Sequence, residues 1–166
     1  MSGGPVWLPP LMPFAKYDGN WNKYLDALYG KFKTDFIDTK PCFHGTKLGL
    51  KRHPLSEGKE ATFWHLISGG KDEATREIDI RRCERVAWAR AVIDNAGDPS
   101  IREWKNERKG GQRICLWLED HEYLVVLADR GSYLLPWTAY LVTRPHGKRR
   151  LRREYDEWVH EQGQKG

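Results

Sequence analysis

Apolar residues recur at two different periods along the chain, and the periods separate a helical first part from a strand-rich second part. Residues 18–38 carry aromatic and leucine side chains at helical spacing, which predicts an amphipathic helix capped by Asp18 or Asn20. Gly30 weakens this helix midway, so a kink or an early end is expected there. Residues 81–99, "RRCERVAWARAVIDNAGDP", predict a second helix that stops at a Gly and a Pro.

Four strand-like runs follow in the second part and predict an antiparallel meander. Polar or glycine-containing corners separate the runs, as in β-hairpins. The runs are "IREWKNER" (101–108), "QRICLWLED" (112–120), "EYLVVLADR" (122–130) and "SYLLPWTAYLVT" (132–143). A basic segment at 147–161 then predicts a closing helix. The expected fold class is therefore α+β, with N-terminal helices packed on a four-stranded antiparallel meander sheet and a basic C-terminal helix.

The last of these runs contains a break in its pattern. Pro136 cannot donate to a strand ladder, so this run is an edge strand or carries a bulge just before Thr138. Strict alternation places Thr138 and Tyr140 on one face together with Leu134, and Trp137 on the other face. Thr138 and Tyr140, which we call the hydroxyl pair, have two explanations. They form either the solvent-exposed side of an edge strand or part of a site on the sheet face, and both interpretations stay open.

Length and composition indicate one domain with one core. The chain has 166 residues, of which 39% are hydrophobic and 31% charged. Residues 1–17 contain four Pro and two Gly and predict an extended arm, which leaves 18–162 as a single α+β domain. The N-terminus lacks a basic region before an apolar stretch, and no apolar run approaches the roughly 18 residues of a membrane helix. A cytoplasmic protein without membrane contact is expected.

The sequence carries no pattern typical of a metal, nucleotide or disulfide site. Cys42, Cys83 and Cys115 are odd in number and show no CxxC spacing, so reduced, buried structural cysteines are expected. The motifs GxxxxGK[ST], GxGxxG, HExxH and GxSxG are all absent. We therefore expect neither a cofactor nor a metal, and the remaining candidates for chemistry are His, Arg, Lys, Thr and Tyr.

His65 is the first of these candidates. It lies in residues 61–70, "ATFWHLISGG", a short apolar segment that periodicity assigns to neither helix nor strand. A histidine among apolar residues is more often a structural core residue than a catalyst. A partly buried imidazole is also what a general base requires, which makes His65 a catalytic candidate together with Thr138 and Tyr140.

Basic residues form three candidate groups for contact with a polyanion, and each group also fits an ordinary solvated surface. The net charge is +5 and the sequence pI is about 9.1, with six Lys or Arg between residues 144 and 153. In "RRCER", helical spacing places Arg81 and Arg85 on one face with Arg82 beside them, which would make a fork for phosphate or for internal carboxylates. The groups are Lys47, Lys51, Arg52 and His53; Arg76, Arg81 and Arg82; and Lys148, Arg149 and Arg150.

This inventory fits cleavage of RNA by its own 2′-hydroxyl. A base removes the hydroxyl proton, cations stabilise the phosphorane, and an acid protonates the leaving 5′-oxygen. The product is a cyclic phosphate, and DNA is immune because it lacks the nucleophile.

Residues 59–143 resemble the phage-associated branch of the barnase–EndoU–colicin–RelE-like ribonuclease group. The elements that carry the resemblance are "FWHLI", "IREW", "RICLWLEDHEYLVVL" and "WTAY". It implies a helical part packed on a four-stranded antiparallel sheet, with the active site on the sheet face. It further implies that His65 is the base or acid and that Thr138 and Tyr140 position the scissile phosphate. The cation of the group matches no single position, because Arg76, Arg81, Arg82 and Lys51 all compete; Arg81 and Arg82 are taken as the catalytic candidates. The first 55 residues and the basic C-terminal helix lie outside the resemblance.

The favoured function is a toxin-like, metal-independent endoribonuclease acting on tRNA or mRNA, with a cognate antitoxin or immunity protein as a further partner. Two alternatives remain. In one, the chain is a non-catalytic nucleic-acid-binding module whose basic helix contacts phosphates. In the other, the basic helix docks onto an acidic protein such as an antitoxin or a phage component.

Overall fold

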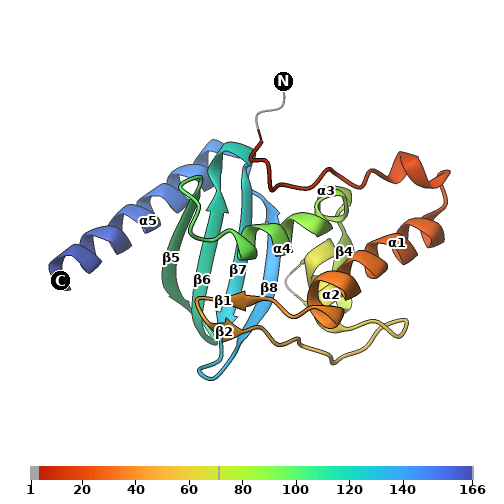
Figure 1. Cartoon of the computed structure of the whole chain (residues 1–166), viewed down its shortest axis with the longest axis horizontal. Helices are drawn as coiled ribbons and strands as arrows, with labels where there is room; N and C mark the ends of the chain where they lie inside the picture. The colour runs from red at the N-terminus through yellow and green to blue at the C-terminus, as the bar shows by residue number, and fades with distance from the viewer. Residues whose placement is uncertain (1–3, 71, 166) are drawn as a thin grey trace.

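The centre of the fold is one antiparallel sheet with the strand order β5-β6-β7-β8, as the meander pattern predicts. The computed structural model describes residues 4–70 and 72–165. Figure 1 shows the sheet between the helical first part of the chain and the long C-terminal helix, so the expected α+β class is confirmed. The strands are β5 (Ile101–Arg108), β6 (Gly111–Leu118), β7 (Tyr123–Asp129) and β8 (Leu134–Leu141).

Strand β8 forms the edge of this sheet and carries the predicted bulge. Val126 pairs with Thr138 whereas Leu127 pairs with Pro136, which leaves Trp137 without a partner on β7. The expectation that Leu134 shares a face with Thr138 is wrong, because the extra residue shifts the alternation by one. Leu134 instead packs into the core on the helical side of the sheet.

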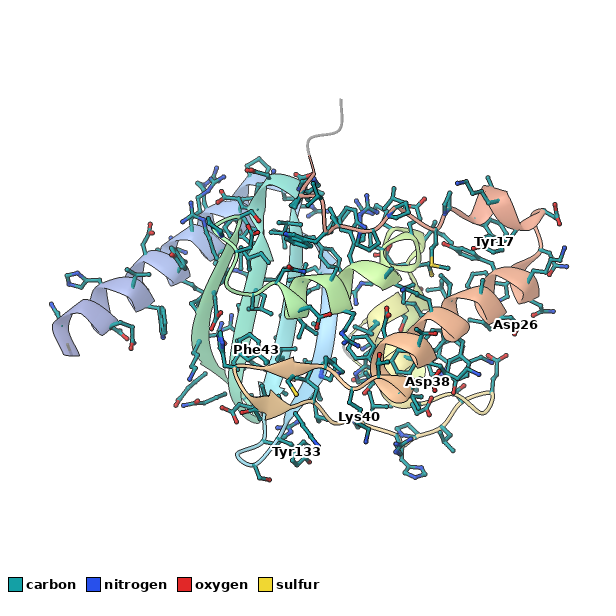
Figure 2. All side chains as sticks on the ribbon, in the orientation of Figure 1. Tyr17, Asp26, Asp38, Lys40, Phe43 and Tyr133 are labelled. Carbon is teal, nitrogen blue, oxygen red and sulfur yellow. The ribbon has the colours of Figure 1, made fainter. Side chains whose placement is uncertain are left out.

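Helices cover one face of the sheet. Helix α4 (Val86–Asp94) packs on β6 and β7, α2 (Ala61–Ile67) packs on β8, and α1 (Trp21–Lys33) packs on α4 (Figure 1). The shared core contains mainly aromatic and aliphatic side chains, among them Tyr24, Leu28, Phe32, Phe63, Val92, Leu116, Val125 and Leu127. Figure 2 shows side chains filling the space between the helices and the sheet.

Two helix boundaries differ from the predicted ones. Asn20 caps α1 by accepting from the Lys23 amide, but Gly30 does not end the helix, which continues into the π-helical turn η2 (Thr34–Asp38). The predicted helix 81–99 is two helices, α3 (Ile80–Glu84) and α4, because Arg85 leaves the helical conformation with φ −109° and ψ 19°. The segment 61–70 is helical as far as Ile67.

Helix α5 (Pro145–Lys165) covers the second face and extends beyond the sheet (Figure 1). A second apolar cluster joins it to the sheet through Trp104, Trp117, Leu124 and Leu151. The helix is longer than the predicted 147–161. In the described part of the chain, no helix has the length and apolar character that a membrane crossing requires.

The remaining elements are short. Residues 4–17 run along the helical side, where the Met12 amide donates to the Glu84 carbonyl and the Trp88 indole donates to the Pro9 carbonyl; residues 1–3 of the predicted arm lie outside the description. The short elements are the 3-10 helices η1 (Phe14–Tyr17), η3 (Glu73–Thr75) and η4 (Glu119–His121), and the strands β1 (Cys42–Phe43), β2 (Thr46–Lys47), β3 (Ser68–Gly69) and β4 (Glu77–Ile78).

Candidate functional site

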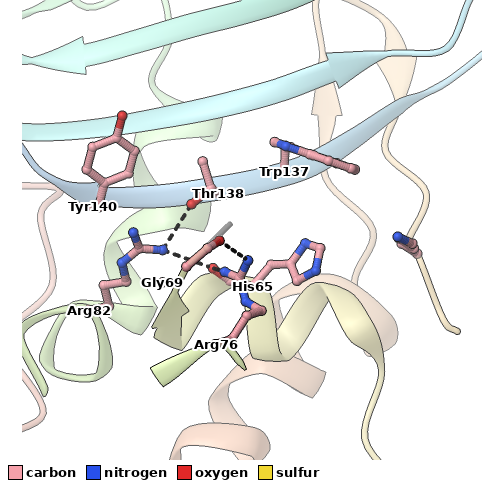
Figure 3. Close-up of a pocket in the computed structure, with 9 residues that line it drawn as sticks. His65, Gly69, Arg76, Arg82, Trp137, Thr138 and Tyr140 are labelled. Carbon is pink, nitrogen blue, oxygen red and sulfur yellow. Dashed lines mark hydrogen bonds between the residues drawn. The ribbon is translucent and has the colours of Figure 1, made fainter. Parts of the chain in front are cut away.

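A pocket of about 410 Å³ lies where α2 and α3 face the edge strand β8; we call it the cationic pocket. Elements from distant parts of the sequence meet there: the segment before α2, the α2–β3 corner, the start of α3 and the bulge of β8 (Figure 3). It contains four of the predicted catalytic residues, His65, Arg82, Thr138 and Tyr140. Lys51 and Arg76, predicted as nucleic-acid contacts, also line it. The described lining consists of Lys51, His65, Gly69, Gly70, Arg76, Arg82, Trp137, Thr138 and Tyr140.

His65 lies in the last turn of α2 and is 5% exposed. Its ring packs edge-on against Trp137, with ring centroids 5.6 Å apart and an interplanar angle of 82°. The neighbours of His65 in sequence, Phe63 and Ile67, point into the core, and this burial fixes the short helix against the sheet. His65 is therefore held at the wall of the pocket by packing on both sides.

Two arginines bind the carbonyl groups that the last turn of α2 leaves without helical partners. Arg82 Nη1 donates to the carbonyls of Ser68 at 2.5 Å and His65 at 3.3 Å. Arg76 Nη2 donates to the same Ser68 carbonyl at 2.6 Å, and Arg76 Nη1 donates to the Gly70 carbonyl at 3.3 Å. Cations at a helix C-terminus also interact favourably with the negative end of the helix dipole. The same two side chains therefore stabilise α2 and bring positive charge to the pocket (Figure 3).

Arg82 also connects this corner to the hydroxyl pair on β8. Its Nη1 donates to Thr138 Oγ1 at 3.1 Å, and its guanidinium lies over the Tyr140 ring at 5.0 Å (Figure 3). Thr138 and Tyr140 share a face of β8, as the alternation predicts, and both border the pocket. Because Thr138 accepts from Arg82, its own hydroxyl hydrogen is left to donate elsewhere.

The electrostatic character of the pocket is positive. No Asp or Glu occurs among the described residues that line it. Burial lowers the pKa of Arg82, and Asp79, whose Oδ2 lies 3.7 Å from Arg82 Nε, opposes this shift. Lys51 stands on the opposite side, 5.7 Å from the centre of the Trp137 ring. Such an arrangement favours an anionic ligand over a neutral one.

Trp137 is a site residue that sequence reasoning missed. As the bulged residue of β8 it turns its ring toward three cations, Lys51 at 5.7 Å, Arg113 at 4.9 Å and Arg130 at 5.4 Å. The signal was present, because a bulge was predicted next to Pro136, but strict alternation placed Trp137 on the face opposite Thr138 and Tyr140. Gly69 and Gly70 of "SGG" also line the pocket.

The other predicted residues lie outside the cationic pocket. Arg81 is exposed at the start of α3 and does not line the pocket, so the predicted arginine fork does not act as one unit. Lys47 is exposed on β2. Arg52 pairs with Glu60 at 3.5 Å, and His53 is exposed beside it.

The basic residues of α5 face three directions. Lys148 pairs with Glu122 at 2.5 Å, which ties the helix to the β6–β7 corner. Arg149 is exposed and lines neither the cationic pocket nor the groove beside α5. Arg150 borders that groove on the second face of the sheet. Only one of the three is thus placed near the hydroxyl pair.

Within the described residues, no three His, Cys, Asp or Glu side chains are grouped as a metal site would require. The sequence matches no model of a known protein family, and neither curated proteins nor solved structures give a match. A function for this chain must therefore be argued from its pocket.

Proposed function

We propose that the chain is a metal-independent endoribonuclease that cleaves RNA by attack of a 2′-hydroxyl on the adjacent phosphate. The observation that carries the proposal is the meeting of a buried histidine, a fixed arginine and a hydroxyl pair in one pocket whose described lining residues include no carboxylate. Each member corresponds to one requirement of the reaction: a proton carrier, a fixed positive charge and donors to the phosphate oxygens.

In the proposed cleavage step, both the attacking 2′-oxygen and the leaving 5′-oxygen belong to the RNA. His65 removes the proton from the 2′-oxygen, which attacks phosphorus as the bond to the 5′-oxygen breaks. A proton passes to that leaving oxygen, from the protonated His65 or from water, and the products are a 2′,3′-cyclic phosphate and a 5′-hydroxyl end. The cyclic phosphate keeps the same negative charge as the diester.

Arg82 and Lys51 are the proposed partners of the non-bridging phosphate oxygens, with Thr138 and Tyr140 as hydroxyl donors. Arg82 is held by its contacts with the α2 carbonyls, so it needs no reorganisation as charge develops on the phosphorane. Gly69 leaves room for this placement, since a Cβ there would lie 3.0 Å from Arg82 Nη2.

The resemblance to the phage-associated branch of the barnase–EndoU–colicin–RelE-like group supports this proposal at the same residues, His65, Thr138 and Tyr140. It adds that the substrate is tRNA or mRNA in the cytoplasm, and that an antitoxin or immunity protein controls the enzyme. A non-catalytic nucleic-acid-binding module is the second candidate, and the basic groove beside α5 favours it.

The test uses purified protein, labelled total tRNA and single-stranded DNA of matched length, in excess EDTA. The proposal predicts that tRNA alone is cut, with cyclic phosphate ends, and that His65→Gln stops the cutting while the circular dichroism spectrum is kept. Salt-sensitive binding of both nucleic acids without any cutting would replace the nuclease by the binding module.

A further inference from the structure

A second cavity, of about 430 Å³, lies beside β8 on the face of the sheet that α5 covers; we call it the α5 groove. It shares Trp137, Thr138 and Tyr140 with the cationic pocket, so the bulge of β8 separates two adjoining hollows. The α5 groove is also rich in positive charge, although its lining includes the carboxylate of Glu154, which pairs with Arg108. Its basic lining residues are Arg108, Lys109, Arg113 and Arg150.

Arg113 of β6 is the unusual member of this set, because it is 7% exposed and carries its charge close to other cations. Burial lowers the pKa of its guanidinium, and the neighbouring Arg130 and Arg108 lower it further. Arg113 Nη1 donates to the Gln112 carbonyl at 3.2 Å, and its guanidinium lies over the Trp137 ring.

No carboxylate within the described ranges lies in ion-pair contact with Arg113, whereas its neighbour Arg108 is paired with Glu154 at 3.0 Å. A buried cation without an anionic partner is unfavourable, and a bound anion removes that penalty. Arg113 therefore favours binding of an anion in the α5 groove. This position adjoins the cationic pocket, where the reaction is proposed, at the bulge of β8.

We propose that the α5 groove binds the phosphodiester of a nucleotide next to the one held in the cationic pocket, so that a single RNA strand crosses β8 at Trp137. This inference rests on the proposed function in one respect, namely that the bound polyanion is RNA. The cationic pocket and the α5 groove share lining residues, so they are placed to bind consecutive phosphates of one polyanion. The three cations around Trp137 come from both sides of the bulge and join the hollows into one basic track.

The experiment measures binding alone, so that its result is independent of cleavage. Calorimetric titration in EDTA compares a 2′-O-methyl uridine dinucleotide, which has one phosphodiester, with the corresponding hexanucleotide; neither has a free 2′-hydroxyl next to its phosphates. The variants are Arg113→Gln and, as a control of equal charge, Arg153→Gln, whose side chain is exposed on the outer face of α5. Arg150→Gln, also exposed, probes the groove from the helix side without altering a buried position.

If the α5 groove is a subsite, Arg113→Gln weakens hexanucleotide binding by about tenfold, while dinucleotide binding changes less than about twofold. The slope of the logarithm of the hexanucleotide binding constant against the logarithm of the salt concentration falls in magnitude by about one. Arg150→Gln shows the same dependence on length with a smaller effect, and it decides the matter if Arg113→Gln fails to fold. The inference is overturned if these variants match Arg153→Gln on the hexanucleotide, or if they weaken both ligands equally. Absence of RNA cutting by the wild type would contradict the nuclease and leave this binding result unaffected.

Discussion

Arg82 Nη1 donates to Thr138 Oγ1 over 3.1 Å and thereby joins α3 to the edge strand of the sheet. The same nitrogen contacts the carbonyls of His65 and Ser68 at the end of α2. One guanidinium therefore sets the relative positions of the helix that carries the proposed base and the strand that carries the hydroxyls. Structural and catalytic roles coincide at Arg82, and variants of it must be interpreted with both in mind.

Replacement of Arg82 by Met is expected to destabilise the fold. The buried carbonyls and Thr138 lose a charged donor, which costs about 2 kcal/mol in the free energy of unfolding. Arg81→Met removes the same charge one residue earlier, at an exposed position, and should change stability by less than about 0.5 kcal/mol. Urea unfolding followed by tryptophan fluorescence gives both values. Equal effects of the two variants would show that the capping contacts of Arg82 contribute little.

The hydroxyl of Thr138 can be tested with little effect on packing. Thr138→Val keeps the shape of the side chain but removes the donor to the phosphate, and we expect RNA cleavage to slow by about tenfold to hundredfold. Thr138→Ser retains the hydroxyl and should stay within a few-fold of the wild type. Single-turnover cleavage rates with a labelled oligoribonucleotide provide the comparison. If the Val and Ser variants are equally active, the Thr138 hydroxyl makes no contribution to cleavage.

The three cysteines should differ sharply in reactivity. Burial raises the pKa of Cys83 to about 12 and that of Cys115 to about 12, so thiolate is scarce at both near neutral pH. Cys42 is exposed. A disulfide exchange reagent at about pH 8 should titrate one thiol rapidly in the native protein and all three in urea. Rapid reaction of a second thiol in the native state would mean that the core opens around one of the buried cysteines.

Acid should loosen α5 before the rest of the fold. Burial alone raises the pKa of Glu154, but hydrogen bonds from Asn106, Trp104 and Arg108 outweigh it and hold the pKa below its ordinary value of 4.5. Because the folded pKa is the lower one, the stabilisation is complete above about pH 4.5 and is lost as the pH falls through the folded value.

The matched variants are Glu154→Gln and Glu161→Gln, the second at an exposed position on the same helix. Urea unfolding at about pH 7 and about pH 3.5 should show a weaker loss of stability on acidification for Glu154→Gln than for the wild type. Glu161→Gln should follow the wild type. An unchanged acid response in Glu154→Gln would indicate that other carboxylates hold α5 to the sheet.

The pattern of apolar and polar residues was sufficient to predict the sheet, because each strand pairs with the next one along the chain through a short corner. Residues 101–108 form β5 with the predicted bounds, and Pro136 correctly indicated an edge strand with a bulge. The face of Leu134 was assigned wrongly, since alternation fails across a bulge and only the register with β7 shows where it lies. Likewise, nothing local to Arg85 indicated the break between α3 and α4.

The site was less accessible to such reasoning, because its charges come from different elements. His65, Thr138 and Tyr140 were identified by residue type, and the structure brings them to one pocket. Arg81 and Arg82 are adjacent in sequence and equivalent in composition, yet only the second reaches β8, since helix geometry turns the two side chains apart. Arg113 was not selected, because its burial depends on packing against Trp137 from another strand.

The most direct measurement uses a DNA oligonucleotide that contains one ribonucleotide, incubated with the protein in excess EDTA. The proposed mechanism predicts a single cut, immediately 3′ to the ribonucleotide, leaving a cyclic phosphate; a 2′-O-methyl group at the same position should abolish it, as should His65→Gln. Cutting at other positions, of the all-DNA strand or of the methylated strand, would contradict attack by the 2′-hydroxyl, and full activity of His65→Gln would contradict the assigned base.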